Sequence, residues 1–327
     1  MAGILQKLLS ISPAQAGFAR RRFHFLRDAA RQRLETVGET FLRGYNLALA
    51  DRGIESLAER LNVIDLEFRG YAFEGAAMGL DILDQLQPRK TSRIDNLLRG
   101  PGRPHVYMVH VGIGWSMARW RLGIERRLAQ LDSLLQWLSL DGFGFHEGYF
   151  HWPRYAAGTP PRYRIIRGYG LRAFDQGLGR SLWFVGGTDL GYITSAISRF
   201  PESRRDDLWS GIGLACTYAG GIESVDIHRL RLASGPHWPH LAQGAVFAAG
   251  ARHRAGNVAP QTQLGCQLLC GLSAQQAANL SENMFRKVSE DAQPAYEAWR
   301  HLIRTQLQLD AVLDAERMVA LADQKEA

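Results

Sequence analysis

The feature that most constrains the fold is that the sequence resembles itself. Residues 69–79 align with residues 210–220, so that glycines, aromatic residues and small residues fall at matching positions. Two further pairs of segments follow in the same order, namely 111–119 with 244–252 and 140–143 with 269–272. Ordered matches separated by small deletions indicate an internal duplication. Chance agreement in a chain with 34 glycines is the alternative.

Hydrophobic residues recur at three- and four-residue spacing from Leu26 to Leu61 and again from Leu302 to Leu313. This spacing is typical of amphipathic helices. The sequence therefore predicts a mainly α fold, in which two tandem, pseudo-symmetric, glycine-rich helical repeats form one compact unit. We expect an N-terminal amphipathic and basic segment, a first repeat, a connector, a second repeat, and a C-terminal helix with a tail, at residues 1–25, 26–151, 152–169, 170–285 and 286–327.

Glycines inside predicted helices need a physical reason, because each costs about 1 kcal/mol relative to alanine in a helix interior. Close contact between helix backbones is one explanation. A groove in which a flat or rod-shaped ligand lies against bare backbone is the other. Both stay open for Gly70, Gly75, Gly79, Gly211, Gly213, Gly220 and Gly221.

The composition is that of an ordinary globular protein, with 46% hydrophobic and 22% charged residues. The net charge of +7 comes mainly from arginine, which is densest between Arg20 and Arg33. Cys216, Cys266 and Cys270 are odd in number, which argues against a disulfide framework. The sequence has neither a nucleic-acid-binding motif nor the roughly 18 uninterrupted apolar residues of a membrane span. We expect a cytoplasmic protein that reaches a membrane only through a partner.

The densest group of reactive side chains lies between Asp141 and Trp152, in an aromatic and glycine-rich segment. His146, Glu147 and His151 are the candidate catalytic residues, because imidazole and carboxylate groups serve as acids, bases and metal ligands. The two histidines are five positions apart, so they do not share a helix face as in the zinc motif H-E-x-x-H. In an irregular loop they could still converge. A purely structural role in capping and core hydrogen bonds is equally compatible with the sequence.

A second group of polar residues recurs in both predicted repeats. The histidines of residues 236–243 are matched by His105 and His110, which suggests that they face each other across a cleft between the repeats. Capping and loop hydrogen bonds explain these histidines equally well. The candidate substrate-binding residues are His110, Trp115, Trp209, Tyr218, His237, His240 and Gln243. The sequence has no P-loop, dinucleotide-binding or zinc-ligand motif, so metal and cofactor stay unknown.

Several longer segments resemble the UnbL-type enediyne biosynthesis proteins, a bacterial family without an established catalytic residue. These segments cover residues 3–13, 18–21, 33–38, 41–46, 143–150, 207–215 and 218–221. The resemblance implies a role in antibiotic biosynthesis, beside a polyketide synthase that makes a linear polyene. The implied partners are that polyene and other proteins of the gene cluster, including a membrane protein and an ASPIC/UnbV-type protein.

Two classes of function follow. In the first, the protein helps to mature the polyene into the enediyne core, as an enzyme or as an essential subunit of one. In the second, it is a non-catalytic polyene-binding or assembly protein that docks on a membrane partner through residues 1–33. Desaturation would require an oxidant for which the sequence shows no binding motif, so a partner would supply it.

Overall fold

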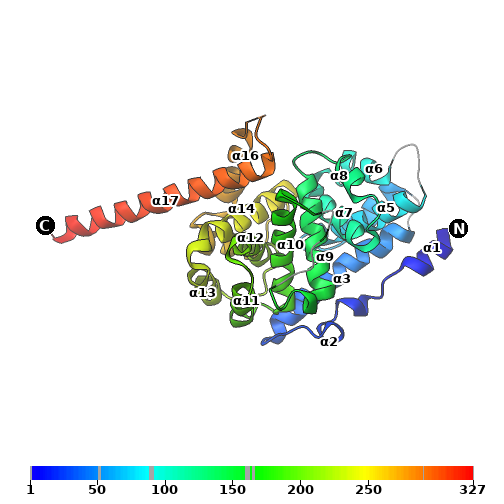
Figure 1. Ribbon diagram of the computed structural model, residues 1–327, viewed down its shortest axis with the longest axis horizontal. Coiled ribbons are helices and arrows are strands. Elements are labelled where there is room, and N and C mark those ends of the chain that lie inside the picture. Colours follow the sequence, from blue (N-terminus) through cyan, green and yellow to red (C-terminus); the bar gives the residue numbers. More distant parts are fainter. Residues whose placement is uncertain are drawn as a thin grey trace.

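The computed structural model describes residues 2–50, 53–87, 92–158, 163, 166–289 and 291–326, with the side chains of residues 6–313. Within these ranges every regular element is a helix, which confirms the mainly α prediction (Figure 1). Seven helices form the centre of the molecule: α3 (Asp28–Ala50), α5 (Arg69–Leu86), α7 (Val106–Trp120), α9 (Gln136–His151), α10 (Tyr169–Val185), α12 (Glu202–Tyr218) and α14 (Trp238–Arg254).

Shorter helices surround these seven central helices. They are α1 (Ala2–Leu9), α2 (Phe18–Arg21), α4 (Ile54–Asn62), α6 (Arg93–Arg99), α8 (Ile124–Leu128), α11 (Leu190–Ser198), α13 (Ser224–Ser234), α15 (Pro260–Cys270) and α16 (Ala274–Arg286). Single 3-10 turns add η1 (Pro13–Ala16), η2 (Arg103–His105), η3 (Trp152–Arg154) and η4 (Gly235–His237). The long helix α17 (Ala295–Glu326) packs on α14 and α16.

The seven central helices pack in the order in which they follow along the chain, α3 on α5, α5 on α7, and so on to α12 on α14. Glycine makes this packing unusually close. A Cβ atom on Gly177 of α10 would lie 1.8 Å from the carbonyl oxygen of Asp141 in α9. A Cβ atom on Gly144 of α9 would lie 2.0 Å from the carbonyl oxygen of Phe174 in α10. The two backbones therefore touch, at a separation that excludes any side chain.

The same reciprocal contact joins five of the six neighbouring pairs in the row; between α5 and α7 only Gly112 of α7 makes it, against the carbonyl oxygen of Glu74. In α7, α9, α10 and α12 two glycines are separated by one residue; the first touches the preceding helix and the second touches the following helix. A Cβ atom added to any of the glycines in these contacts would lie 1.8–2.1 Å from a backbone carbonyl oxygen of a neighbouring central helix. They are Gly44, Gly75, Gly112, Gly114, Gly142, Gly144, Gly177, Gly179, Gly211, Gly213 and Gly244. Close backbone contact is thus confirmed as a reason for Gly75, Gly211 and Gly213.

The row of helices curls until its two ends meet. Arg33 of α3 donates a hydrogen bond from Nε to the carbonyl oxygen of Ala219, directly after α12, at 2.6 Å. Arg252 of α14 donates to the carbonyl oxygens of Glu67 and Tyr218. Tyr71 of α5 and Tyr218 of α12 meet edge to face, with ring centroids 5.2 Å apart. The result is a ring of helices whose interior lies between α5 and α12.

The N-terminal segment lies against α3. Tyr45 Oη donates to the carbonyl oxygen of Leu9 at 2.9 Å, and the amide of Asn46 exchanges hydrogen bonds with the backbone of Ile11. Phe18 N donates to Glu35 Oε1 at 2.9 Å. The segment is therefore attached to the ring before α3 begins.

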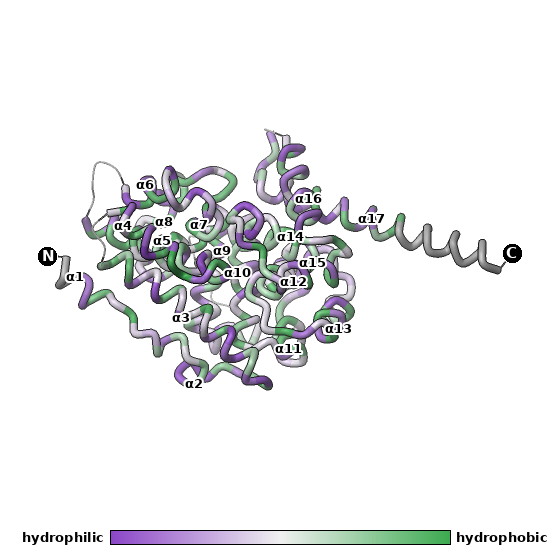
Figure 2. Tube along the Cα trace, turned by 180° about the vertical axis from the view of Figure 1, so that it is seen from behind, coloured by the Kyte–Doolittle hydropathy of each residue, from purple (hydrophilic) through white to green (hydrophobic). Residues whose placement is uncertain are grey.

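Several central helices are buried on all sides. In α5 the run from Gly70 to Leu83 is buried without interruption, so this helix has no solvent face. Figure 2 shows hydrophobic residues along such central helices. The proline- and glycine-containing stretch 88–104 contains α6, and the leucine-rich stretch 106–139 is interrupted between α7 and α9.

The twofold repetition and the five segment boundaries stay predictions. Of the predicted connector, residues 159–162, 164 and 165 lie outside the described residues, as do residues 1, 290 and 327 of the terminal segments. No helix in the described ranges combines the length and apolar character that crossing a membrane requires.

We predict that Gly177→Ala lowers the free energy of unfolding by about 1–3 kcal/mol, because the new methyl group must push α9 and α10 apart. Gly191→Ala is the matched control. In α11 the nearest heavy atom to its new Cβ would be 3.4 Å away, so the better helix propensity of alanine should stabilise this variant by up to about 1 kcal/mol. Urea unfolding of both variants measures the difference, and equal effects would contradict the packing argument.

Candidate functional site

Two adjoining cavities lie inside the ring of helices. The first has about 620 Å³ of space not filled by atoms, part of it continuous with solvent. Its aromatic walls come from six different helices and consist of Phe41, Tyr71, Trp115, Phe145, Tyr149, Phe150, Phe184 and Tyr218. Glu74 and Arg180 are the charged residues among its lining side chains. Such an apolar space with a few polar groups is typical of a small-molecule site.

The second cavity, of about 550 Å³ measured in the same way, continues toward α14, α16 and α17. Tyr107, Phe247, Tyr296 and Trp299 line it. Arg180, Leu214 and Tyr218 line both cavities and so form the wall between them. At the far end of the first cavity, Gln15 and Ala16 of the N-terminal segment complete the lining.

Glu74 of α5 is a buried carboxyl group at the edge of the first cavity. Trp115 donates a hydrogen bond from Nε1 to Glu74 Oε1 at 3.0 Å, and Arg180 approaches the same oxygen at 4.0 Å. Arg180 itself forms an ion pair with Asp141. Burial raises the pKa of Glu74 to about 7, with the charge of Asp141 acting in the same direction and Arg180 and Trp115 opposing it. A carboxyl group with such a pKa can give or take a proton near neutral pH.

Among the described residues, the buried hydroxyl groups of Tyr71 and Tyr218 lack a partner at hydrogen-bond geometry, although Tyr218 also interacts with the Asn257 side chain. Both Tyr71 Oη and Tyr218 Oη are buried, and both side chains line the first cavity. Leaving a buried hydroxyl unpaired costs about 1–3 kcal/mol. These two groups are therefore available to a bound molecule that carries a hydrogen-bonding atom.

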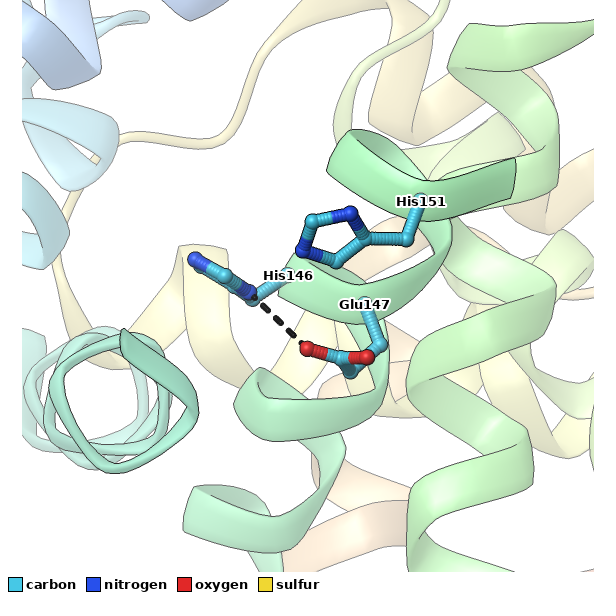
Figure 3. A group of neighbouring side chains, drawn as sticks. All are labelled: His146, Glu147 and His151. Atoms are coloured by element: carbon cyan, nitrogen blue, oxygen red, sulfur yellow. Dashed lines mark ion pairs between the residues drawn. The ribbon is translucent and has the colours of Figure 1, made fainter. Parts of the chain in front are cut away.

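The three predicted catalytic residues converge at the end of α9. Their potential ligand atoms all lie within 4.8 Å of one another, and Figure 3 shows the three side chains together. His146 and Glu147 are inside the last turn of the helix, while His151 has φ −130° and ψ 25°. Because the helical geometry ends at His151, its side chain can approach His146 in spite of the five-residue spacing. The three side chains thus converge at the end of a helix, and not in an irregular loop.

Glu147 is held by three side chains. Oε1 accepts a hydrogen bond from Arg121 at 2.7 Å, and Oε2 accepts from Tyr155 at 3.0 Å and from Tyr163. Burial by itself would raise the pKa of Glu147, but the His146 ring, the Tyr163 hydroxyl and the Arg121 guanidinium lower it to about 2. Burial lowers the pKa of both His146 and His151. The site thus combines an ionised carboxylate with imidazoles that favour the neutral form.

The aromatic wall of the first cavity separates the two groups of titratable residues. The edge of the Trp115 ring meets the ring of His146 at a centroid distance of 5.6 Å, and Phe150 lies 4.7 Å from His146. Both Trp115 and Phe150 also line the first cavity. His146 is therefore one side chain away from that cavity.

The predicted substrate-binding residues lie in different places. Trp115 and Tyr218 line the first cavity, and Tyr218 also lines the second. His110 contacts the carbonyl oxygen of Val106 within its own helix, and Trp209 is buried in the core. His237 and His240 both face Asp206. Gln243 accepts hydrogen bonds from Ser210 and Arg300.

The sequence matches one family model, described as protein of unknown function DUF1702, over residues 1–307. The chain belongs to this family. No curated protein and no solved structure matches the chain. The match assigns the family and leaves the enediyne setting as a prediction.

Sequence reasoning missed Glu74, Arg180 and Tyr71 as site residues. Glu74 and Tyr71 lie within residues 69–79, the first of the matched segments, in which only the glycines were interpreted. Glu74 is a carboxyl group in an otherwise apolar run. A charged residue that interrupts a buried helix was the available signal. Arg180 has the same signal, since it lies inside the buried part of α10.

We predict that Glu74 makes the protein less stable as the pH rises. Because its pKa is raised from 4.5 to about 7, the folded state holds this proton more tightly than the unfolded chain does. The contribution of Glu74 to the free energy of unfolding therefore falls between about pH 4.5 and pH 7, by about 3 kcal/mol at most. Glu74→Gln should remove this dependence.

Urea unfolding at pH 5 and pH 8 tests this. Relative to the unsubstituted protein, Glu74→Gln should gain stability on going from pH 5 to pH 8. Glu39→Gln, at an exposed position in α3, is the control and should follow the unsubstituted protein. Parallel pH profiles for Glu74→Gln and the unsubstituted protein would show that Glu74 is not the responsible group.

Proposed function

We propose that this protein binds an extended, conjugated, apolar molecule inside the ring of helices, and that it helps to mature a polyketide synthase-derived linear polyene into an enediyne core. The observation that carries the binding proposal is the pair of adjoining, aromatic-lined cavities. The resemblance to UnbL-type proteins is what suggests the polyene.

The lining suits a conjugated chain. Aromatic rings offer flat, polarisable faces to an extended π system. The polar groups are few and lie together, since the unpaired Tyr71 and Tyr218 hydroxyls lie near Glu74 at the wall between the cavities. A carbonyl or carboxyl group on the ligand would satisfy both hydroxyls. The ligand class is therefore a long apolar chain with one oxygen-bearing group.

Glu74 supports a catalytic role over simple shielding. A carboxyl group with a pKa of about 7 in an apolar cavity can move a proton to or from a bound polyene, whose conjugation spreads the resulting charge. Moving a double bond along the chain requires a proton to be removed from one carbon and a proton to be added to another, and one carboxyl group can do both in turn. Dehydrogenation to alkynes needs an oxidant as well, which another protein of the same pathway would supply.

The alternative is a non-catalytic binding or assembly protein. In this alternative residues 1–33 dock on a membrane partner, but several polar groups of this segment already bond to the ring of helices. Phe18 N donates to Glu35 of α3, and His24 N donates to the carbonyl oxygen of Val185 in α10, each at 2.9 Å. These contacts favour attachment of the segment to its own body.

Binding can be tested with a fluorescent conjugated tetraene fatty acid, which brightens in an apolar site. We expect saturable binding, at least tenfold weaker in Leu214→Trp, because the larger ring fills the wall shared by both cavities. Leu232→Trp, at a position that is 80% exposed, makes the same substitution on the surface and should bind normally. Equal binding by both variants would refute the cavity as the binding site.

The pathway is tested by deleting the gene in a producing strain and profiling its extracts by mass spectrometry and ultraviolet absorption. We expect loss of the finished metabolite and accumulation of linear polyenes. Complementation with Glu74→Gln separates the two classes of function, because a binding protein would restore production and a proton-transfer enzyme would not. An unchanged profile after deletion would remove the protein from this pathway.

A further inference from the structure

We propose that His146, Glu147 and His151 bind one divalent first-row transition-metal ion. The ligands would be one nitrogen of each imidazole and one oxygen of the carboxylate. This inference stands on the side chains at the end of α9 and does not depend on what occupies the cavities.

Distances between the ligand atoms fit a metal site. His146 Nδ1 lies 3.5 Å from Glu147 Oε1, and all three potential ligand atoms lie within 4.8 Å of one another (Figure 3). Ligand atoms at about 2.0–2.2 Å from a metal are about 3.3–3.6 Å apart in a tetrahedral site and cannot exceed about 4.4 Å. The His146–Glu147 pair already has the tetrahedral separation. The third ligand lies up to 4.8 Å from one of the other two, so reaching the tetrahedral separation requires its side chain to move by up to about 1.2–1.5 Å.

Within the part of the chain that the structure describes, the buried nitrogen Nδ1 of His146 has no partner at hydrogen-bond geometry. Its contact with Glu147 Oε1 is at ion-pair distance and lacks hydrogen-bond geometry. A buried ring nitrogen in a native protein is usually paired with a donor, an acceptor or a metal. A metal ion between these two atoms would satisfy the nitrogen.

Glu147 has room for one more partner. A carboxylate has about four lone-pair positions. Tyr155 and Tyr163 occupy those of Oε2, and Arg121 occupies one on Oε1. The remaining position is on Oε1, the oxygen closest to His146 Nδ1.

The surroundings of Glu147 match those of a supported metal ligand. The hydroxyls of Tyr155 and Tyr163 are 2.9 Å apart and both contact Oε2, so they fix the orientation of the carboxylate. Hydrogen bonds of this kind to a ligating carboxylate tune metal affinity. His146 and Glu147, which are buried and adjacent in α9, thus present their polar groups at one place.

Arg121 balances the carboxylate charge while no ion is bound. It follows α7 with a left-handed backbone (φ 44°), and its side chain is 43% exposed, so the guanidinium can turn into solvent. An arriving cation would then replace the guanidinium as the counter-charge. Removing Arg121 should therefore strengthen metal binding, whereas a purely structural ion-pair cluster would gain nothing from its removal.

Two imidazoles and one carboxylate select the class of metal. Imidazole favours Zn²⁺, Fe²⁺, Co²⁺, Ni²⁺ and Cu²⁺ over Mg²⁺ and Ca²⁺, which prefer oxygen ligands. Three protein ligands also leave at least one coordination position open, as in catalytic metal sites. The open position would accept water or an oxygen-bearing molecule.

Co²⁺ is a suitable probe, because it takes the place of Zn²⁺ or Fe²⁺ and absorbs visible light when bound. The full chain is treated with a chelator, dialysed and titrated with Co²⁺ while its visible spectrum is recorded. We expect one Co²⁺ per chain. His146→Gln and His151→Gln should each weaken binding by at least about 100-fold, exceeding the roughly 10–100-fold effect of losing a supporting hydrogen bond, which Tyr163→Phe should show.

Two controls decide the outcome. His228→Gln, at an exposed position in α13, should leave Co²⁺ binding unchanged, and Arg121→Gln should bind Co²⁺ more tightly than the unsubstituted protein. Absence of a visible band in both the unsubstituted protein and Arg121→Gln overturns the proposal. So does a band that persists in His146→Gln and His151→Gln.

Discussion

The architecture depends on contact between the backbones of neighbouring helices. At each step of the row, a glycine on one helix meets a carbonyl oxygen on its neighbour, and at every step except that between α5 and α7 the neighbour returns the contact. Helix axes held this close leave no space for side chains at the contact itself. Large side chains such as Phe145, Phe184 and Trp115 lie around the cavities inside the ring instead. The glycines thereby decide where the aromatic residues gather.

Glu74 and Glu147 are two buried glutamates near the aromatic residues around Trp115. Their environments shift their pKa values in opposite directions. Glu74 receives one hydrogen bond from Trp115 and only a distant guanidinium, so burial dominates and its pKa rises to about 7. Glu147 lies beside the His146 ring, the Tyr163 hydroxyl and the Arg121 guanidinium, which together lower its pKa to about 2. One carboxyl group can therefore exchange a proton near neutral pH, while the other keeps its charge. Paired carboxyl groups with separated pKa values are a recurrent property of functional sites.

Part of this could be predicted from the sequence. The helical class follows from hydrophobic residues at three- and four-residue spacing, and close backbone contact is one of the two explanations that the sequence offers for Gly75, Gly211 and Gly213. Trp115 and Tyr218 line the cavities, and their role in binding stays a prediction.

Convergence of His146 and His151 could not be predicted from spacing, because it depends on where α9 ends. The matched histidines suggest a shared cleft, yet His237 pairs with Asp206, which no local pattern indicates.

The glycine contacts also restrict how a molecule can enter the protein. Neighbouring helices whose backbones touch cannot separate sideways without breaking several contacts at once. The seam between α3 and the end of α12 is different, because side chains hold it, through Arg33 and the carbonyl oxygen of Ala219. A side chain can change its rotamer without moving a helix, so this seam is the part of the wall that the glycine contacts do not fix.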